Sequence, residues 1–274
     1  MKDEALQIGR YEIFVFNDGL FEAKAEYLHH LDGPEASAST VERWGKTSTM
    51  LDVNCFALRG PDGDMLIDTG AGTAWGPGFG HARPAMEAKG FTPESITCVL
   101  LTHIHGDHAY GLLNDDGTAY FPNADILVPH ADLAFFGDPA LRETVSEARR
   151  GGFTVADKMQ RAYGSRIRSL SAGPIFEGIE AVPLPGHTPG QMGFSLQGSE
   201  DDLLILADAL HIAELQLADP KLGLVFDLDP VQSAATRLAT LEQAAQHGWI
   251  VGGGHLHGFG RIERAQTGFR MIGL

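Results

Sequence analysis

The residues best able to do chemistry are three histidines and an aspartate that fall between positions 103 and 108. The segment THIHGDH, at 102 to 108, directly follows an apolar run at 97 to 101. In extended chain, His103 and His105 project to the same side. Gly106 then permits a turn, so that Asp107 and His108 reach back towards the same point at the start of a helix. Four potential ligands converge here, whereas a lone histidine would more simply be a solvated loop residue or a cap.

Three further polar residues follow apolar, strand-like runs later in the chain. His187 follows residues 179 to 184, Asp208 ends the run at 203 to 207, and His255 follows residues 249 to 251 and three glycines. Loops at strand ends are where a rigid sheet positions a site. His257 lies two residues beyond His255 and is an alternative ligand. His29, His30, His81, His130 and His247 have no such partners, and we interpret them as surface or capping residues.

The complete donor set consists of imidazoles and carboxylates with no cysteine nearby. Such a set suits zinc, and also iron, manganese or cobalt. Seven ligands are too many for one tetrahedral zinc ion. Two divalent metal ions that share one carboxylate would use all seven: His103, His105, Asp107, His108, His187, Asp208 and His255.

The elements that must position these residues form two patterns along the chain. Alternating apolar residues predict antiparallel strands at 11–17, 51–58 and 65–67, with a hairpin turn at 61–64. Strands and helices then alternate. We predict strands at 97–101, 126–128, 179–184, 192–196, 203–207 and 249–251, and helices at 84–89, from 107, at 131–136, at 140–163 with a break at Gly151-Gly152, and at 231–247. This pattern predicts an α/β (α+β) layered sandwich.

Composition narrows the class of protein. The 274 residues are 43% hydrophobic, enough for one large core, and no linker divides residues 1–274, so we expect a single domain. Twenty basic and 36 acidic residues give a net charge of −16, which disfavours nucleic-acid and membrane partners. Cys55 and Cys98 lie in apolar runs and are expected to be buried free thiols. The N-terminal residues 1–16 do not resemble a signal peptide, which favours a cytoplasmic location.

The motifs HIHGDH, GHTPGQ, ADALH and GGGHLHGFG, with DTGAG upstream, resemble the metallo-β-lactamase superfamily of hydrolases from about residue 51 onwards. The resemblance implies a four-layer αβ/βα sandwich with a dinuclear site at one edge. It implies that His103, His105 and His187 hold the first metal, that Asp107, His108 and His255 hold the second, and that Asp208 bridges them. It also favours His255 over His257 as the ligand. Asp68, in DTGAG, resembles the carboxylate that orients a metal-bound imidazole in this superfamily.

An aspartate at the bridging position resembles the glyoxalase, lactonase and organophosphate-hydrolase branches, and argues against antibiotic hydrolysis. The C-terminal stretch from 226 to 263 is similar to the methyl parathion hydrolase and lactonase branch. The implied reaction is attack by a metal-bridging hydroxide on a lactone, ester or organophosphate triester, with Asp107 as the catalytic proton carrier. Familiar homoserine lactonases place a tyrosine where this chain has His211.

The partner is therefore expected to be a small-molecule substrate. Trp75, Tyr110, Phe136 and His211 are candidate substrate contacts, and the glycine-rich segment 69–81 is interpreted as a flexible loop that covers the substrate. A homodimer is an expectation from related enzymes. Three alternatives remain open: a glyoxalase II-like thiolester hydrolase, an iron-dependent redox protein, and a catalytically weak member that binds a signal molecule.

Overall fold

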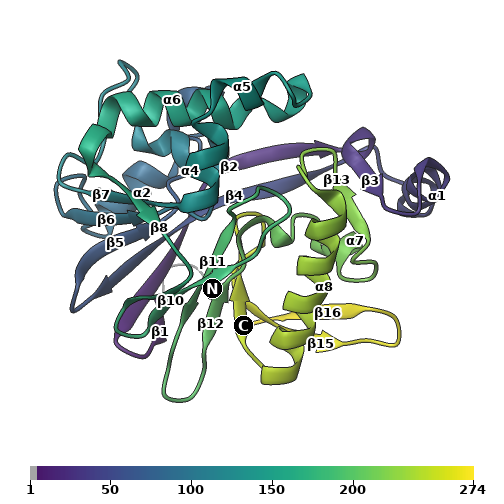
Figure 1. The fold of residues 1–274 in the computed structure, drawn as a ribbon. Helices are drawn as coiled ribbons and strands as arrows, with labels where there is room; N and C mark the ends of the chain where they lie inside the picture. The colour runs from purple at the N-terminus through teal and green to yellow at the C-terminus, as the bar shows by residue number, and fades with distance from the viewer. Residues whose placement is uncertain (1–4) are drawn as a thin grey trace.

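Two seven-stranded sheets form the centre of the computed structural model, which describes residues 5–274 (Figure 1). In spatial order, the first sheet comprises β1 (Leu6–Ile8), β2 (Tyr11–Lys24), β4 (Ser48–Gly60), β5 (Gly63–Ile67), β6 (Ile96–Leu100), β7 (Asp125–Pro129) and β8 (Ile167–Leu170). The second comprises β16 (Phe269–Gly273), β15 (Gly260–Arg264), β14 (Ile250–Gly252), β12 (Leu203–Ile205), β11 (Met192–Leu196), β10 (Ile179–Pro183) and β9 (Gly173–Phe176).

Alternation along the strands assigns side chains to different layers of the core. In β5, Met65 and Ile67 pack in the cluster shared by both sheets, together with Phe194 and Ile205 of the second sheet. Leu66, between them, points the opposite way into a cluster with the helices outside the first sheet. Because successive side chains of a strand point to opposite faces, each central strand contributes to two apolar layers.

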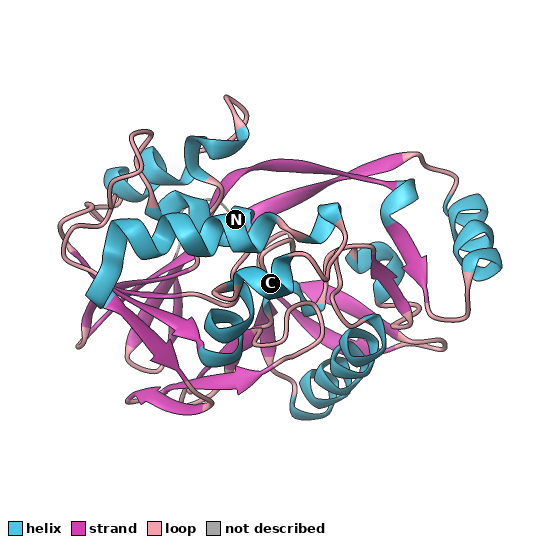
Figure 2. Cartoon of the chain, turned by 45° about the horizontal axis from the view of Figure 1, so that its top comes forward, coloured by secondary structure: helices cyan, strands magenta, loops and turns pink. Residues whose placement is uncertain are grey.

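Helices cover the outer faces of the sheets (Figure 2). The cluster outside the first sheet takes side chains from α2 (Ala82–Ala88), α4 (His130–Phe136) and α6 (Gly151–Tyr163), and the cluster outside the second sheet takes side chains from α8 (Pro230–His247). The order is therefore helix, sheet, sheet, helix, which confirms the predicted α/β sandwich. The short helices are α3 (Gly106–Ala109), α5 (Pro139–Arg142) and α7 (Ala213–Gln216).

The helix predicted at 231–247 is α8, and its ends follow the expected chemistry. Asp229 accepts a hydrogen bond from the Gln232 backbone N–H at 2.9 Å, and Pro230 occupies the first helical position. Gly248 ends the helix in the left-handed conformation, with φ of 68°.

An N-terminal arm extends from the first sheet. Strand β2 is 14 residues long, and its pairing with β4 continues past the ends of the other strands of the sheet. The arm continues through β3 (Leu28–His30) and α1 (Pro34–Trp44), and β3 pairs with β13 (Leu222–Leu224). Figure 1 shows β3, α1 and β13 together at one end of the molecule. The arm therefore places residues 21–30 beside residues 222–226.

Several predictions required correction. The 140–163 segment is not one broken helix: α5 is separate, and α6 begins at Gly151 rather than breaking there. The helix expected from 107 is a single turn. Helix α1 was not predicted, and only Thr40 of its 11 residues is buried. His30, interpreted as surface or capping, is buried, bonded to Asp219 and accepts a hydrogen bond from the Asp32 N–H.

Cys55 and Cys98 are buried free cysteines, as expected. Within residues 5–274, no helix has the length and apolar character needed to cross a bilayer. Residues 1–4, part of the N-terminal segment interpreted as lacking a signal peptide, lie outside the described residues.

Candidate metal centre

The first sheet delivers five polar residues to one edge. Strands β5 and β6 are parallel, so their carboxyl ends lie side by side. Asp68 follows β5, His103 and His105 follow β6, and the turn of α3 carries Asp107 and His108. Asp68 adopts a left-handed φ of 57°, which is rare outside glycine and recurs at functional sites.

The second sheet delivers the other three. Strands β10 and β12 are both antiparallel to β11, and β12 is parallel to β14, so the three strands run the same way. His187, Asp208 and His255 follow their carboxyl ends. Ala207, directly before Asp208, also has a left-handed φ, of 49°.

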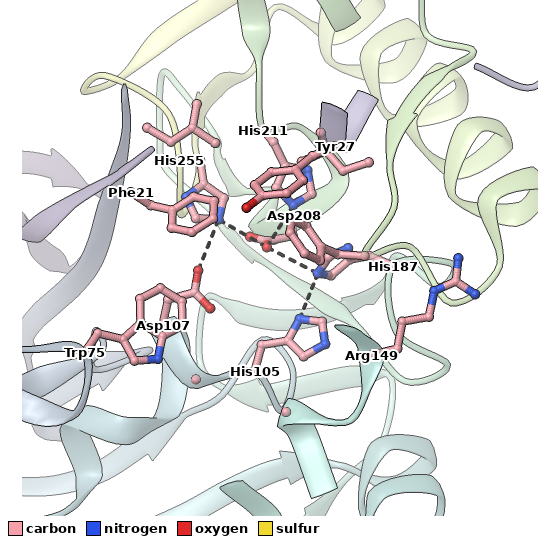
Figure 3. A pocket seen from close by; sticks show the side chains of 15 residues that line it. Phe21, Tyr27, Trp75, His105, Asp107, Arg149, His187, Asp208, His211 and His255 are labelled. Carbon is pink, nitrogen blue, oxygen red and sulfur yellow. Dashed lines mark hydrogen bonds and ion pairs between the residues drawn. The ribbon is translucent and has the colours of Figure 1, made fainter. Parts of the chain in front are cut away.

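The seven predicted ligands meet at the edge where the two sheets come together. Figure 3 shows His105, Asp107, His187, Asp208 and His255 gathered around one point. One group is His103, His105 and His187: His105 Nδ1 lies 3.1 Å from His103 Nε2 and 2.9 Å from His187 Nε2. The second group is Asp107, His108 and His255, in which Asp107 Oδ2 lies 3.7 Å from His108 Nε2 and 3.5 Å from His255 Nε2. Each group offers three donor atoms to one centre.

Asp208 lies between the two groups. Its Oδ2 is 3.4 Å from His187 Nε2 and 3.2 Å from His255 Nε2, and its Oδ1 is 3.3 Å from His108 Nε2. One carboxylate therefore contacts a histidine of each group, which is the arrangement expected of a ligand shared by two ions.

The outward nitrogens of the histidines fix their protons away from the centre. His255 Nδ1 donates to the Asp52 carbonyl at 2.7 Å, and His108 Nδ1 donates to Asp68 at 2.8 Å. His187 Nδ1 donates to Asp227 at 2.8 Å. In the neutral ring, a proton on Nδ1 leaves a lone pair on Nε2. The Nε2 lone pairs of these three histidines all face the centre of the site, where the neighbouring atoms are other acceptors rather than donors.

His103 belongs to the same network through Thr102. The Thr102 hydroxyl donates to Asp68 Oδ2 at 2.8 Å, so its oxygen accepts from His103 Nδ1 at 3.0 Å. Asp68 also accepts from the Thr102 backbone N–H at 2.8 Å. Asp68 thus holds one histidine of each group, His108 directly and His103 through Thr102.

Burial and charge act in opposite directions on these imidazoles. Burial lowers the pKa of His103 and His105 well below the usual value, which keeps their lone pairs free. Burial also opposes the charged form of His108, but the carboxylates of Asp208, Asp107 and Asp68 outweigh it and raise that pKa well above the usual value. The electrostatic potential at His108 is therefore negative and favours a bound cation.

Divalent cations fit this donor set. His108 Nε2 and Asp208 Oδ1 are buried and have no hydrogen-bond partner among the described residues, a costly state unless a ligand satisfies them. A Cβ on Gly254 would lie 2.8 Å from His108 Cε1 and 3.1 Å from Asp208 Oδ1, so only glycine leaves the ring and carboxylate in place. Nitrogen and carboxylate ligands in this number suit two ions.

Comparison with known sequences decides the family. Residues 48–255 match the sequence profile of the metallo-beta-lactamase superfamily. The chain belongs to the metallo-beta-lactamase superfamily.

Two curated relatives illustrate the range within the superfamily. The chain is 27% identical to the uncharacterized protein YobT of Bacillus subtilis over 165 residues, 60% of this chain and 64% of YobT. It is 30% identical to the probable metallo-hydrolase Rv2300c of Mycobacterium tuberculosis over 174 residues, 55% of this chain and 54% of that protein. The matched segments span just over half to just under two thirds of these relatives.

Two solved structures share the whole fold of this chain. The hydrolase AbOPH superposes with a TM-score of 0.88 at 24% identity, covering 99% of this chain and 97% of that one. The lactonase AidC superposes with a TM-score of 0.86 at 20% identity, with the same coverage. These superpositions confirm the predicted sandwich fold, and the match over residues 48–255 confirms the predicted superfamily.

Three aspartates beyond the predicted set hold predicted ligands or their loops. Asp227 orients His187. Asp52 accepts from His255 through its backbone carbonyl, while its carboxylate binds the exposed ring of His257. Asp132 joins two ligand loops: it accepts from the Ile104 N–H, the Gly190 N–H and the Thr188 hydroxyl at 2.7–2.9 Å. Burial raises the pKa of Asp132 to about 6 against these three donors. None lies in a ligand motif, so the sequence offered no signal for them.

A pocket of about 310 Å³ opens directly onto the ligands and is lined by Asp107, His187, Asp208 and His255. Of the predicted substrate contacts, Trp75 and His211 line it. Tyr110 instead lines a second pocket with Lys158 and Arg161. Phe136 is 3% exposed and packs in the core beside His105, with ring centroids 6.0 Å apart.

The remaining wall of the pocket was not predicted. Phe21, Tyr27 and Phe226 form with Trp75 a group of contacting rings, the aromatic wall, with centroid separations of 5.2–6.4 Å. Leu51, Leu224 and Arg149 also line this pocket. These residues belong to the N-terminal arm and to segments far from the ligand motifs, so their meeting depends on tertiary structure.

Proposed function

We propose that this protein hydrolyses carboxylic esters, lactones first among them, with two divalent metal ions, and that zinc is the first candidate. One observation carries the proposal: seven inward-facing ligand groups from two sheets converge at the floor of a largely apolar pocket. Such a pocket accepts an uncharged acyl or aryl group, while the ligands hold the reacting bond beside the metal ions.

When bound, two divalent cations lower the pKa of a coordinated water and polarise the carbonyl or phosphoryl oxygen of a substrate. His103, His105 and His187 would hold one ion, Asp107, His108 and His255 the other, and Asp208 both. The charge on Asp208 is buried and therefore suited to a permanent ligand.

Asp107 is the proposed proton carrier. It lines the pocket, and its side chain is 14% exposed, whereas that of Asp208 is 3% exposed. Because Asp107 Oδ2 faces His108 and His255, Oδ1 remains to accept a proton from the attacking water and return it to the leaving oxygen.

His211 is a proposed positioning residue. Its Nε2 lies 3.1 Å from Asp208 Oδ2 and donates to it, so Nδ1 presents a lone pair. Nδ1 is buried without a partner among the described residues. In this tautomer His211 orients the shared carboxylate and does not donate to a substrate carbonyl.

The activity of one structural relative agrees with this substrate class. AidC is described as a dizinc quorum-quenching lactonase in complex with a hexanoyl homoserine product. Organophosphate triesters, as in the methyl parathion hydrolase branch, are the second candidate, because the aromatic wall suits an aryl leaving group.

We also propose that the protein forms a homodimer, which light scattering would test.

Elemental analysis coupled to a substrate panel tests the proposal. The wild-type protein should hold close to two divalent ions per chain and hydrolyse members of a panel of lactones, aryl esters, a phosphotriester and a thiolester. His105→Ala should lose metal and activity, whereas His130→Ala, at an exposed histidine bonded to Ser169, should lose neither.

Three results would contradict the proposal. Less than one metal per chain under metal-replete conditions would remove its basis. Binding of a lactone without turnover by fully loaded protein would instead favour the signal-binding alternative, and turnover of the thiolester alone would favour the glyoxalase II-like one.

A further inference from the structure

The lining of the pocket is chemically two-sided. The aromatic wall and Leu51 and Leu224 form an apolar side. In Figure 3, Phe21 and Trp75 stand on one side and Arg149 on the other, with His187 and Asp208 between them. Among the described residues that line the pocket, Arg149 is the one lysine or arginine. Although the chain has a net charge of −16, the positive charge of Arg149 would attract an anionic group of a ligand bound in this pocket.

Arg149 is held in place by backbone and not by a carboxylate. It ends the short 3₁₀ turn Glu147–Arg149, and its Nε donates to the Val225 carbonyl at 3.0 Å. Within residues 5–274 no acidic side chain forms an ion pair with it. By contrast, the next residue, Arg150, pairs with Glu143 at 3.3 Å.

The anchor at Val225 ties Arg149 to the rest of the pocket. The Val225 N–H donates to the Tyr27 carbonyl at 2.9 Å, and the Leu228 N–H donates to the His187 carbonyl at 3.1 Å. The same loop therefore contacts the guanidinium, the aromatic wall and a metal-ligand loop. The position of the guanidinium relative to the metal centre is set by this loop.

A guanidinium is always protonated and presents a planar set of donors that matches a carboxylate. With Nε occupied by Val225, the two terminal amino groups remain for a ligand. A partly buried guanidinium without a protein carboxylate has an unmatched charge that an anionic ligand group would neutralise.

We propose that Arg149 is a specificity-determining residue that binds a carboxylate on the substrate. The preferred substrate is then an ester or lactone with an apolar group against the aromatic wall and a carboxylate at Arg149, and the scissile bond lies between them. This inference rests on the proposed function and narrows its substrate class.

Matched aryl esters test it. The acidic series is the 4-nitrophenyl monoesters of succinate, glutarate and adipate, and the neutral series is the corresponding butanoate, pentanoate and hexanoate esters. Wild type should prefer the acid at one chain length, which reports the span from Arg149 to the reacting carbonyl. At that length, Arg149→Gln should reduce the acid-to-neutral ratio of kcat/KM about 10- to 100-fold, as expected for loss of charge-assisted hydrogen bonds.

The variants separate charge from geometry and from folding. The loss in Arg149→Gln should fall mainly on KM, and kcat/KM for the neutral ester should stay within about twofold. Arg149→Lys should recover part of the preference, because it keeps the charge but not the planar fork. Arg150→Gln, at the neighbouring arginine that pairs with Glu143, should leave the ratio unchanged.

A binding measurement separates failure of this inference from failure of the proposed function. Metal-loaded wild type should bind glutaric acid monoanilide about tenfold or more tightly than pentanoic anilide by calorimetry, and Arg149→Gln should abolish the difference. Hydrolysis of neutral esters with no acid preference at any length would overturn the inference alone. No hydrolysis of any ester would overturn the proposed function, and equal binding of both anilides by wild type would then overturn this inference too.

Discussion

Replacing Asp68 with asparagine isolates the proton arrangement that prepares the metal centre. Asn is among the non-glycine residues that best tolerate a left-handed backbone, so the φ of 57° at this position is retained. Asp68 accepts three hydrogen bonds, from the Thr102 N–H, the Thr102 hydroxyl and His108 Nδ1, each at 2.8 Å. An amide has one oxygen and places an NH₂ group where the other oxygen was.

Both orientations of that amide break the network. If the NH₂ faces His108, the ring must shift its proton to Nε2, which blocks the metal-binding lone pair. If the NH₂ faces the backbone, the Thr102 N–H loses its acceptor and the ligand loop is released. One lost charge-assisted bond corresponds to about 1.5–3 kcal/mol. Loss of such a supporting partner reduces metal affinity about 10- to 100-fold.

Chelator competition on purified protein measures this effect. Asp68→Asn should bind metal about 10- to 100-fold more weakly than wild type, with the larger change at the site that contains His108. The matched control is Asp64→Asn, which removes a carboxylate of the same strand that pairs with Arg59 outside the site. Metal affinity within twofold of wild type in Asp68→Asn would refute the proposed role of the His108 proton.

Three other predictions follow from the site. His255→Ala should lower the metal content by about one ion per chain. His257→Ala removes a side chain that is 99% exposed and should keep both ions. If elemental analysis found the reverse, His257 and not His255 would be the metal ligand. Removal of metal with a chelator should lower the melting temperature measured by calorimetry, since ligand at 100 times its Kd stabilises by about 2.7 kcal/mol, and an unchanged transition would argue against a resident metal. Asp132→Ala should lower the unfolding free energy in urea by about 2–4 kcal/mol because three buried donors lose their acceptor, and a loss below about 0.5 kcal/mol would show that water replaces the carboxylate.

The sequence predicted the convergence of the candidate metal ligands better than it predicted any other part of the protein. His103, His105, Asp107 and His108 are close in the chain, so local geometry alone indicates that they converge. His187, Asp208 and His255 each follow a buried strand, and parallel strands bring such ends to one edge. Their meeting with the first cluster needed the resemblance to a known superfamily, because strand order is not encoded in local periodicity.

The substrate side of the pocket was much harder to predict. Phe21 and Tyr27 lie about 200 residues from Phe226 in the chain, and they meet only because β3 pairs with β13. Tyr110 lies two residues after His108, yet it points into a second pocket, and Phe136, also a predicted contact, packs in the core. Proximity in sequence predicts the ligand shell well but predicts little about a wall assembled from distant segments.

The N-terminal arm and the ligand loops contribute to different parts of the site. Residues 21–27 shape the apolar wall but supply no predicted metal ligand, while the ligands come from loops after residue 100. Exchange of the arm between superfamily members would therefore change which acyl or aryl group is accepted and leave the hydrolytic machinery in place. Such modularity provides a route by which new substrates are acquired without rebuilding the reaction centre.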